Sequence, residues 1–84
     1  MKNRSRLEIK AKIVETIGEN GAIQSKIMYT VYLSFLQMKK YLDTLQNKNL
    51  IIFDANGQVY KLTDKGKHFL TLYQKMTESV AMIK

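Results

Sequence analysis

The chain has 84 residues, 45% of them hydrophobic, which is the length and composition of one small globular domain. Fourteen Lys and Arg against seven Asp and Glu give a net charge of +7, which favours polyanionic partners, nucleic acid before anionic membranes. The absence of cysteine excludes disulfides and favours an intracellular protein. No apolar run approaches the ~20 residues that span a bilayer, and we expect no signal peptide.

The first predicted helix begins at Ser5. Residues 5–8, SRLE, have the S-x-x-E spacing of a capping box, in which two side chains satisfy backbone N–H groups at the helix start. Its apolar face comes from residues that recur every four positions, Ile9, Ile13 and Ile17. Gly18 and Asn20-Gly21 predict its end.

Two further helices are predicted before the middle of the chain. Ala22-Ile23 is too short for a strand and predicts one β-bridge, and residues 25–31 predict a short helix. A second capping box, SFLQ at residues 34–37, begins a helix that is expected to run to about Asn47–Asn49.

A β-hairpin is predicted next. Residues 50–54 are rich in β-forming side chains, and Asn56-Gly57 predicts a type I′ turn, which needs positive φ at both central residues. The return strand is expected at residues 59–62, with Tyr60 and Leu62 facing inward.

The last predicted helix is long. Thr63-Asp64 caps it, and it can continue to about residue 82, a length of roughly 30 Å from the rise of an α-helix. Gly66 in its first turn indicates close packing on the hairpin. The order of elements predicts an α+β fold, mostly α: a winged helix-turn-helix with a long C-terminal helix. We expect one domain over residues 1–84, with its core at 4–63 and a dimerisation helix at 64–84.

The helix that begins at Ser34 has two distinct faces. On a helical wheel its core face consists of Met38, Tyr41, Leu42 and Leu45, and its polar face of Gln37, Lys40, Thr44 and Asn47. Amide, ammonium and hydroxyl groups pair with base edges, so the polar face suits the major groove of DNA. The N-terminal part of such a helix enters deepest, and the candidate contacts are Ser34, Phe35, Gln37, Lys39, Lys40 and Thr44, with Lys39 placed to meet phosphate. An ordinary solvated face is the alternative.

Leu33 and Leu36 do not fit this division, because both project near the polar side of the wheel. We expect Leu36 to pack on the preceding short helix, and contact with a thymine methyl is the alternative.

Other candidates for DNA contact lie outside this helix. Arg4, Arg6 and Lys26 are expected to contact phosphate, since cations and backbone donors at helix starts favour anions. The N-terminus also carries Lys10 and Lys12. The alternative to phosphate contact there is a disordered, solvated arm. In the hairpin the candidates are Asn56, Gly57, Gln58 and Lys61, beside the acidic Asp54.

Apolar residues along the last helix are spaced by three and four, as in a coiled coil. The expected dimer interface consists of Phe69, Leu72, Tyr73, Met76, Val80 and Ile83. We expect the first two turns to pack in the domain's own core and the remainder to pair with a second copy. The alternative is that the remainder frays.

Catalytic and cofactor-binding motifs are not found in the sequence. His68 is the only histidine, and the seven acids are scattered without a paired general acid and base. Gly66 is not part of a glycine-rich phosphate-binding motif, so we expect no nucleotide site. With a single histidine, no cysteine and no paired acids, we also expect no cofactor, no metal and no enzymatic activity.

Several short segments together carry a family resemblance: SRLEI at 5–9, SKIMY at 25–29, LSF at 33–35, KKYLDTL at 39–45 and YKLTDKGKHFL at 60–70. In these the chain resembles the small, ten-kilodalton archaeal winged-helix DNA-binding proteins whose C-terminal helices pair as a coiled-coil dimer. The resemblance covers about residues 4–76. It implies a non-enzymatic, cytoplasmic, nucleoid-associated or transcriptional protein that binds double-stranded DNA as a homodimer, with antiparallel pairing of the helices.

Three other functions remain open. A protein–protein interaction module without DNA readout is the main alternative, because fold does not fix function. Binding of RNA or single strands requires aromatic stacking platforms, and the eight aromatic residues fall mostly at predicted core positions. Binding to an anionic membrane requires exposed bulky apolar residues, which we do not expect on the basic N-terminal helix.

Overall fold

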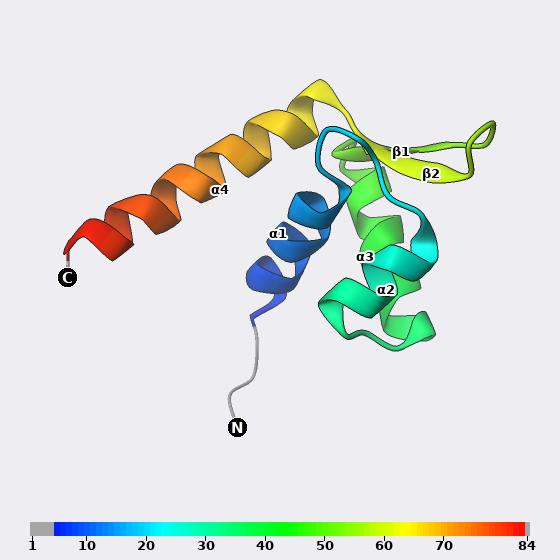
Figure 1. The fold of residues 1–84 in the computed structure, drawn as a ribbon, viewed down its shortest axis with the longest axis horizontal. Coiled ribbons are helices and arrows are strands. Elements are labelled where there is room, and N and C mark those ends of the chain that lie inside the picture. Colours follow the sequence, from blue (N-terminus) through cyan, green and yellow to red (C-terminus); the bar gives the residue numbers. More distant parts are fainter. Residues whose placement is uncertain (1–4, 84) are drawn as a thin grey trace.

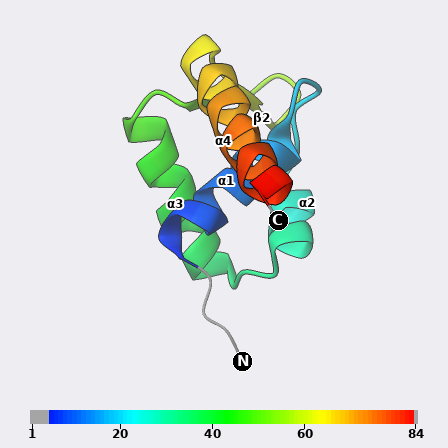
Figure 2. The ribbon, with the colours of Figure 1, turned by 90° about the vertical axis from the view of Figure 1, so that its left-hand side faces the viewer.

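A computed structural model describes residues 5–83 of the chain and the side chains of residues 5–78 (Figure 1). In chain order the elements are α1 (Arg6–Ile17), α2 (Gln24–Val31), α3 (Phe35–Asn47), β1 (Ile51–Asp54), β2 (Val59–Leu62) and α4 (Asp64–Ile83). Three short helices pack around one core, the two-stranded hairpin flanks them, and α4 leads away (Figures 1 and 2). The predicted α+β class and winged helix-turn-helix order are therefore confirmed. Within residues 5–83, no helix is long and apolar enough to cross a membrane.

Both predicted capping boxes form. The hydroxyl of Ser5 accepts from the backbone N–H of Glu8, and the Glu8 carboxylate accepts from the Ser5 N–H, each at 3.0 Å. Ser34 and Gln37 make the same reciprocal pair at 3.2 Å. These bonds satisfy backbone donors that a helix start otherwise leaves open, so they fix where α1 and α3 begin.

The core lies between the three short helices, and β1, β2 and the beginning of α4 pack against it. Its fully buried side chains are Ile13, Val14, Ile17, Ile27, Val31, Met38, Leu42, Leu45 and Ile51. The predicted β-bridge forms between Ala22 and Tyr60 and ties the α1–α2 connection to β2. Tyr60 and Leu62 both pack against the core, as expected of the inward side of β2.

Leu33 is buried, which contradicts the expectation that it projects near the polar side of α3. It precedes the N-cap Ser34, so the helical wheel of α3 does not apply to it. The turn after α2 places it instead: its N–H donates to the carbonyl of Met28 at 3.3 Å and its side chain enters the core. Leu36 is 72% exposed, so the expectation that it packs on α2 is also wrong.

The hairpin turn differs from the prediction. Asp54 pairs with Val59, which leaves a four-residue loop, and positive φ occurs at Gln58 and not at Asn56 or Gly57. The Asp54 carboxylate accepts from the backbone N–H of Asn56 at 3.0 Å, a local bond that competes with a tight two-residue turn. The predicted type I′ turn at Asn56-Gly57 is therefore wrong, although the hairpin itself is confirmed.

Gly66 allows the first turn of α4 to pack closely against the main chain at Leu50. A Cβ at this position would collide with the main-chain carbonyl oxygen of Leu50, so only glycine permits this close approach. The hydroxyl of Thr63 reinforces the junction, because it donates to the carbonyl of Asn49 at 2.6 Å and accepts from the Gly66 N–H at 3.0 Å. The predicted packing of Gly66 on the hairpin is confirmed, and α4 leaves the body from a fixed point (Figure 1).

Candidate nucleic-acid interface

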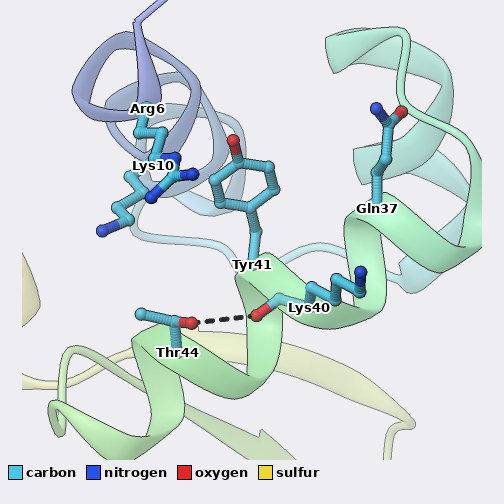
Figure 3. Close-up of a pocket in the computed structure, with 6 residues that line it drawn as sticks. All are labelled: Arg6, Lys10, Gln37, Lys40, Tyr41 and Thr44. Atoms are coloured by element: carbon cyan, nitrogen blue, oxygen red, sulfur yellow. Dashed lines mark hydrogen bonds between the residues drawn. The ribbon is translucent and has the colours of Figure 1, made fainter.

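An open groove of about 430 Å³ separates the N-terminal part of α1 from the polar face of α3. It is lined by Arg6, Lys10, Gln37, Lys40, Tyr41 and Thr44 (Figure 3). Four of these six were predicted as DNA contacts from the sequence: Arg6, Gln37, Lys40 and Thr44. The fold thus brings one predicted phosphate contact from α1 beside three predicted base-reading positions on α3.

Helical spacing explains why these side chains share one groove. Arg6 and Lys10 are four residues apart and lie on one face of α1, and Gln37, Tyr41 and Thr44 are four and three apart on α3. Both sets of side chains line the same groove, and the Tyr41 ring extends from α3 toward Arg6 and Lys10 (Figure 3). Three cations therefore line a surface whose lining includes no carboxylate.

The one acidic residue of α3, Asp43, influences a tyrosine of the hairpin. Burial raises the pKa of the Tyr60 hydroxyl, and the negative charge of Asp43 raises it further. The charge of Asp43 thus reaches Tyr60 on β2, and Asp43 does not line the groove. The positive potential of Arg6, Lys10 and Lys40 is therefore left without an acidic partner in the groove wall.

The polar residues on α3 already take part in local hydrogen bonds. The side-chain oxygen of Gln37 accepts from the Ser34 N–H in the capping box, and the hydroxyl of Thr44 donates to the carbonyl of Lys40 at 3.0 Å (Figure 3). A bidentate pair between Gln37 and adenine needs both its oxygen and its nitrogen. That pairing needs the Gln37 oxygen either to accept two hydrogen bonds at once or to leave the cap, whereas the amide nitrogen alone can donate to an acceptor without this change.

The remaining α3 candidates form a rim at its N-terminus, outside the groove lining. The hydroxyl of Ser34 is held by the cap. The Phe35 ring is half exposed, and the Lys39 ammonium lies 5.9 Å from its centroid, a cation–π contact that orients Lys39. Lys26 is exposed on α2 and does not line the groove, and Arg4 lies outside the described residues.

The hairpin candidates are not brought into the groove. Asn56, Gly57, Gln58 and Lys61 lie in the loop and β2, and none of them lines it. Lys61 forms an ion pair with Asp54, with 3.1 Å between Nζ and Oδ2. The hydrogen bond from Lys61 and the one from the Asn56 N–H hold the pKa of Asp54 below its ordinary value. The single cation of the hairpin is thus balanced by its single acid.

Two groove residues were missed as candidates. Lys10 was noted only as part of a basic N-terminus, and Tyr41, assigned to the core face, packs partly buried against the core and also lines the groove. Their spacing held the signal: Lys10 follows Arg6 by four residues, and Tyr41 follows Gln37 by four.

The predicted dimer helix presents a second, apolar groove. Its volume is about 480 Å³, and its lining includes Leu7 of α1, Leu50, and Phe69 and Leu72 of α4. Phe69 packs partly on the core and stacks against Tyr73, with 6.4 Å between ring centroids. Leu72 and Met76 are about half exposed. The side chains of Val80 and Ile83 lie outside the described residues.

Metal ligands do not gather in the described part of the chain: within residues 5–83, no group of three or more His, Asp or Glu side chains could hold an ion.

Comparison with known proteins agrees with this architecture. The winged helix-turn-helix family matches residues 3–81. A crystal structure of Sso10a-2, a DNA-binding protein from Sulfolobus solfataricus, is similar with a TM-score of 0.79 at 20% identity, and the match covers 95% of this chain and 85% of that one. The resemblance to small archaeal winged-helix proteins is thus confirmed at the level of the fold. A comparison with curated proteins gave no match. The chain belongs to the winged helix-turn-helix family.

Proposed function

We propose that the protein binds double-stranded DNA without catalysis, as a homodimer, with α3 in the major groove and the N-terminal part of α1 on the adjacent phosphates. The observation that carries this proposal is the convergence of Arg6, Lys10 and Lys40 on one groove beside α3. Duplex DNA combines an exposed line of phosphates with a groove that admits a helix, and this surface offers cations and a helix side by side.

The two sides of the groove have different roles. Arg6 and Lys10 come from α1, outside the helix-turn-helix, and long cationic side chains there suit the phosphates that flank an inserted helix. Lys40 and the amide of Gln37 belong to α3 itself, and in this proposal they contact the base edges. Phosphate contacts position a protein on DNA and base contacts specify the sequence, so α1 supplies affinity and α3 supplies any selectivity.

The hairpin has a minor part in this arrangement. Because Lys61 is paired with Asp54, the wing adds no net positive charge. Its loop residues Asn56, Gly57 and Gln58 offer backbone and amide donors at most. Affinity therefore rests on α1 and α3, and loss of the Lys61 charge alone has little effect on DNA binding.

A homodimer is part of the proposal. The half-exposed Leu72 and Met76 continue the apolar lining formed by Leu7 and Phe69, and a second copy would cover this surface. Sso10a-2, whose fold this chain shares, is described as DNA-binding, which supports the DNA role. A dimer would place two α3 helices on one duplex, as dimeric helix-turn-helix proteins do on paired half-sites.

The experiment is a titration of a 20-base-pair duplex at several salt concentrations with the wild-type chain, Lys40→Glu and a matched control, Lys67→Glu. Lys67 is an exposed lysine on α4, outside the groove, so both variants carry the same charge change. We expect Lys40→Glu to weaken binding at least tenfold more than Lys67→Glu does, with unchanged circular dichroism. Equal effects of the two variants would remove α3 from the interface.

The alternative is a protein-binding module without DNA readout. The observation in its favour is the exposure of Leu36 on α3, an apolar side chain on the face assigned to DNA. The same titration separates the two: a folded wild-type chain that binds no duplex at low salt excludes the DNA proposal and leaves the module.

A further inference from the structure

The turn between α2 and α3 exposes an unusual amount of apolar and aromatic surface. Tyr29 is 85% exposed, Tyr32 86% and Leu36 72%, and the ring of Phe35 is half exposed. All four lie within residues 29–36, at the end of α3 that is far from the hairpin (Figures 1 and 2). We call these four residues the turn cluster. The expectation that the aromatic residues fall mostly in the core, which counted against single-strand binding, is therefore wrong for this part of the chain.

Tyr32 is held in a costly backbone conformation. It has φ 60° and ψ 51°, the left-handed region, where glycine or asparagine is the ordinary choice and a bulky side chain is an outlier. The conformation ends α2, because the Tyr32 N–H donates to the carbonyl of Met28 at 3.0 Å. An aromatic ring here gains no burial in return, so folding alone does not account for it.

The surroundings of the turn cluster are positively charged. Between Glu19 and Asp43 the sequence contains no Asp or Glu, and it contains three lysines, Lys26, Lys39 and Lys40. Lys26 precedes Tyr29 by three residues on α2, and the Lys39 ammonium already lies against the Phe35 ring. Each of these two lysines is therefore next to an exposed ring, an arrangement that complements a chain carrying both phosphates and flat apolar groups.

We propose that the turn cluster is a second nucleic-acid surface, which binds unpaired nucleotides by stacking bases on Tyr29 and Tyr32 while Lys26 and Lys39 contact the phosphates. In an intact duplex the base faces are covered by neighbouring base pairs, so exposed rings can stack only where strands are single or opened. An anionic partner without flat apolar groups would use the lysines and leave the tyrosine rings unused.

The proposal goes beyond binding of intact duplex, because the stacking rings of Tyr29 and Tyr32 do not line the groove between α1 and α3. Stacking requires exposed ring faces and no major-groove insertion, whereas the proposed duplex contacts use the groove between α1 and α3. Single-stranded DNA and RNA offer the same stacking chemistry, so both serve as probes and the ratio of their affinities identifies the preferred source.

The test measures fluorescence anisotropy of labelled 12-nucleotide oligothymidylate, 12-nucleotide oligouridylate and a 12-base-pair duplex with the full-length chain. Tyr32→Asn removes the ring while keeping a residue that accepts the left-handed conformation, and Tyr29→Ala removes the second ring. Each is expected to lower single-strand affinity at least about fivefold, the smallest effect typical of a lost base–aromatic stack. Duplex affinity should change less than twofold.

Two controls keep the result specific. Tyr32→Trp keeps an aromatic ring at this position and should retain wild-type single-strand affinity. Phe53→Leu removes an exposed ring from the hairpin and should leave single-strand affinity unchanged. Because none of these changes alters charge, the fold-loss should be the same at low and high salt. Absence of single-strand binding by the wild-type chain, unchanged affinity in both tyrosine variants, or an equal loss on the duplex would each overturn the proposal.

Discussion

Lys61 on β2 and Asp54 on β1 form an ion pair across the hairpin, with 3.1 Å between Nζ and Oδ2. The same carboxylate also accepts from the backbone N–H of Asn56 through its other oxygen. Asp54 therefore organises both the strand pair and the loop, and it neutralises the one cation that the hairpin could offer to DNA. This relationship links the conformation of the wing to its small expected role in binding.

The hairpin is expected to weaken at acidic pH. The pKa of Asp54 is lowered from its ordinary value of 3.8 in the folded state, so the ionised carboxylate stabilises the fold above that pH. This stabilisation is lost as the pH falls through the folded-state pKa. Asp54→Asn, which keeps an oxygen for the loop bond, should lower the melting temperature at pH 7, and this difference should shrink as the pH falls below 3.8. A difference that stays constant however far the pH is lowered below 3.8 would contradict the role of the charge.

Substitution of Gly66 should destabilise the whole domain. A Cβ in Gly66→Ala would meet the carbonyl oxygen of Leu50, and overpacking of this kind costs about 1–3 kcal/mol. Urea denaturation measures the loss. Gly57→Ala is the matched control, because its nearest neighbour would be a Val59 methyl at 3.6 Å and its φ is not positive, so the change should stay within about 0.5 kcal/mol. Equal stability of the two variants would disprove the close packing.

Loss of the α3 cap should affect both stability and binding. Ser34→Ala removes the hydroxyl that accepts from the Gln37 N–H, at a typical cost of about 1 kcal/mol. The start of α3 also positions Gln37 in the groove, so duplex affinity should fall more than in Ser25→Ala, an exposed serine inside α2 that caps no helix. Thermal unfolding and anisotropy on the same samples test both effects, and a Ser34→Ala chain as stable as wild type would argue against the cap.

The apolar side of α4 is expected to hold the dimer together. Leu72→Glu and Met76→Glu place charges on the seam and should convert the dimer to a monomer in light scattering. Thr71→Glu and Lys75→Glu, on exposed positions elsewhere on the helix, are the controls and should leave the mass unchanged. A wild-type mass of one chain, or a dimer that tolerates both seam charges, would exclude α4 as the interface.

Much of the fold could be predicted because its signals are local. The two capping boxes fix the starts of α1 and α3, and Gly66 marks the close contact of α4 with Leu50. The hairpin turn could not be predicted in this way. Its loop length follows from the pairing of Asp54 with Val59, and the Asp54 side chain competes with the backbone pattern that Asn56-Gly57 favours.

The sequence predicted the α3 side of the candidate site and named Arg6 of α1 as a phosphate contact, but it did not predict where Arg6 lies relative to α3. A helical wheel separates Gln37, Lys40 and Thr44 from the core face, but only the packing of α1 shows that Arg6 lies opposite them. The exposure of Tyr32 likewise depends on the left-handed end of α2, which no periodicity reveals. Positions set by turns and by contacts between helices were therefore the ones that the sequence left undetermined.

The most direct test of the central claim is the salt dependence of duplex affinity in wild type and in the triple variant Arg6→Gln/Lys10→Gln/Lys40→Gln. Each phosphate contact contributes about −0.9 to the slope of log affinity against log salt concentration. If Arg6 and Lys10 contact the phosphates that flank α3, the slope should become shallower by roughly two, and loss of Lys40 should lower the affinity further, with the fold and the mass unchanged. A triple variant with the wild-type slope and affinity would contradict the account.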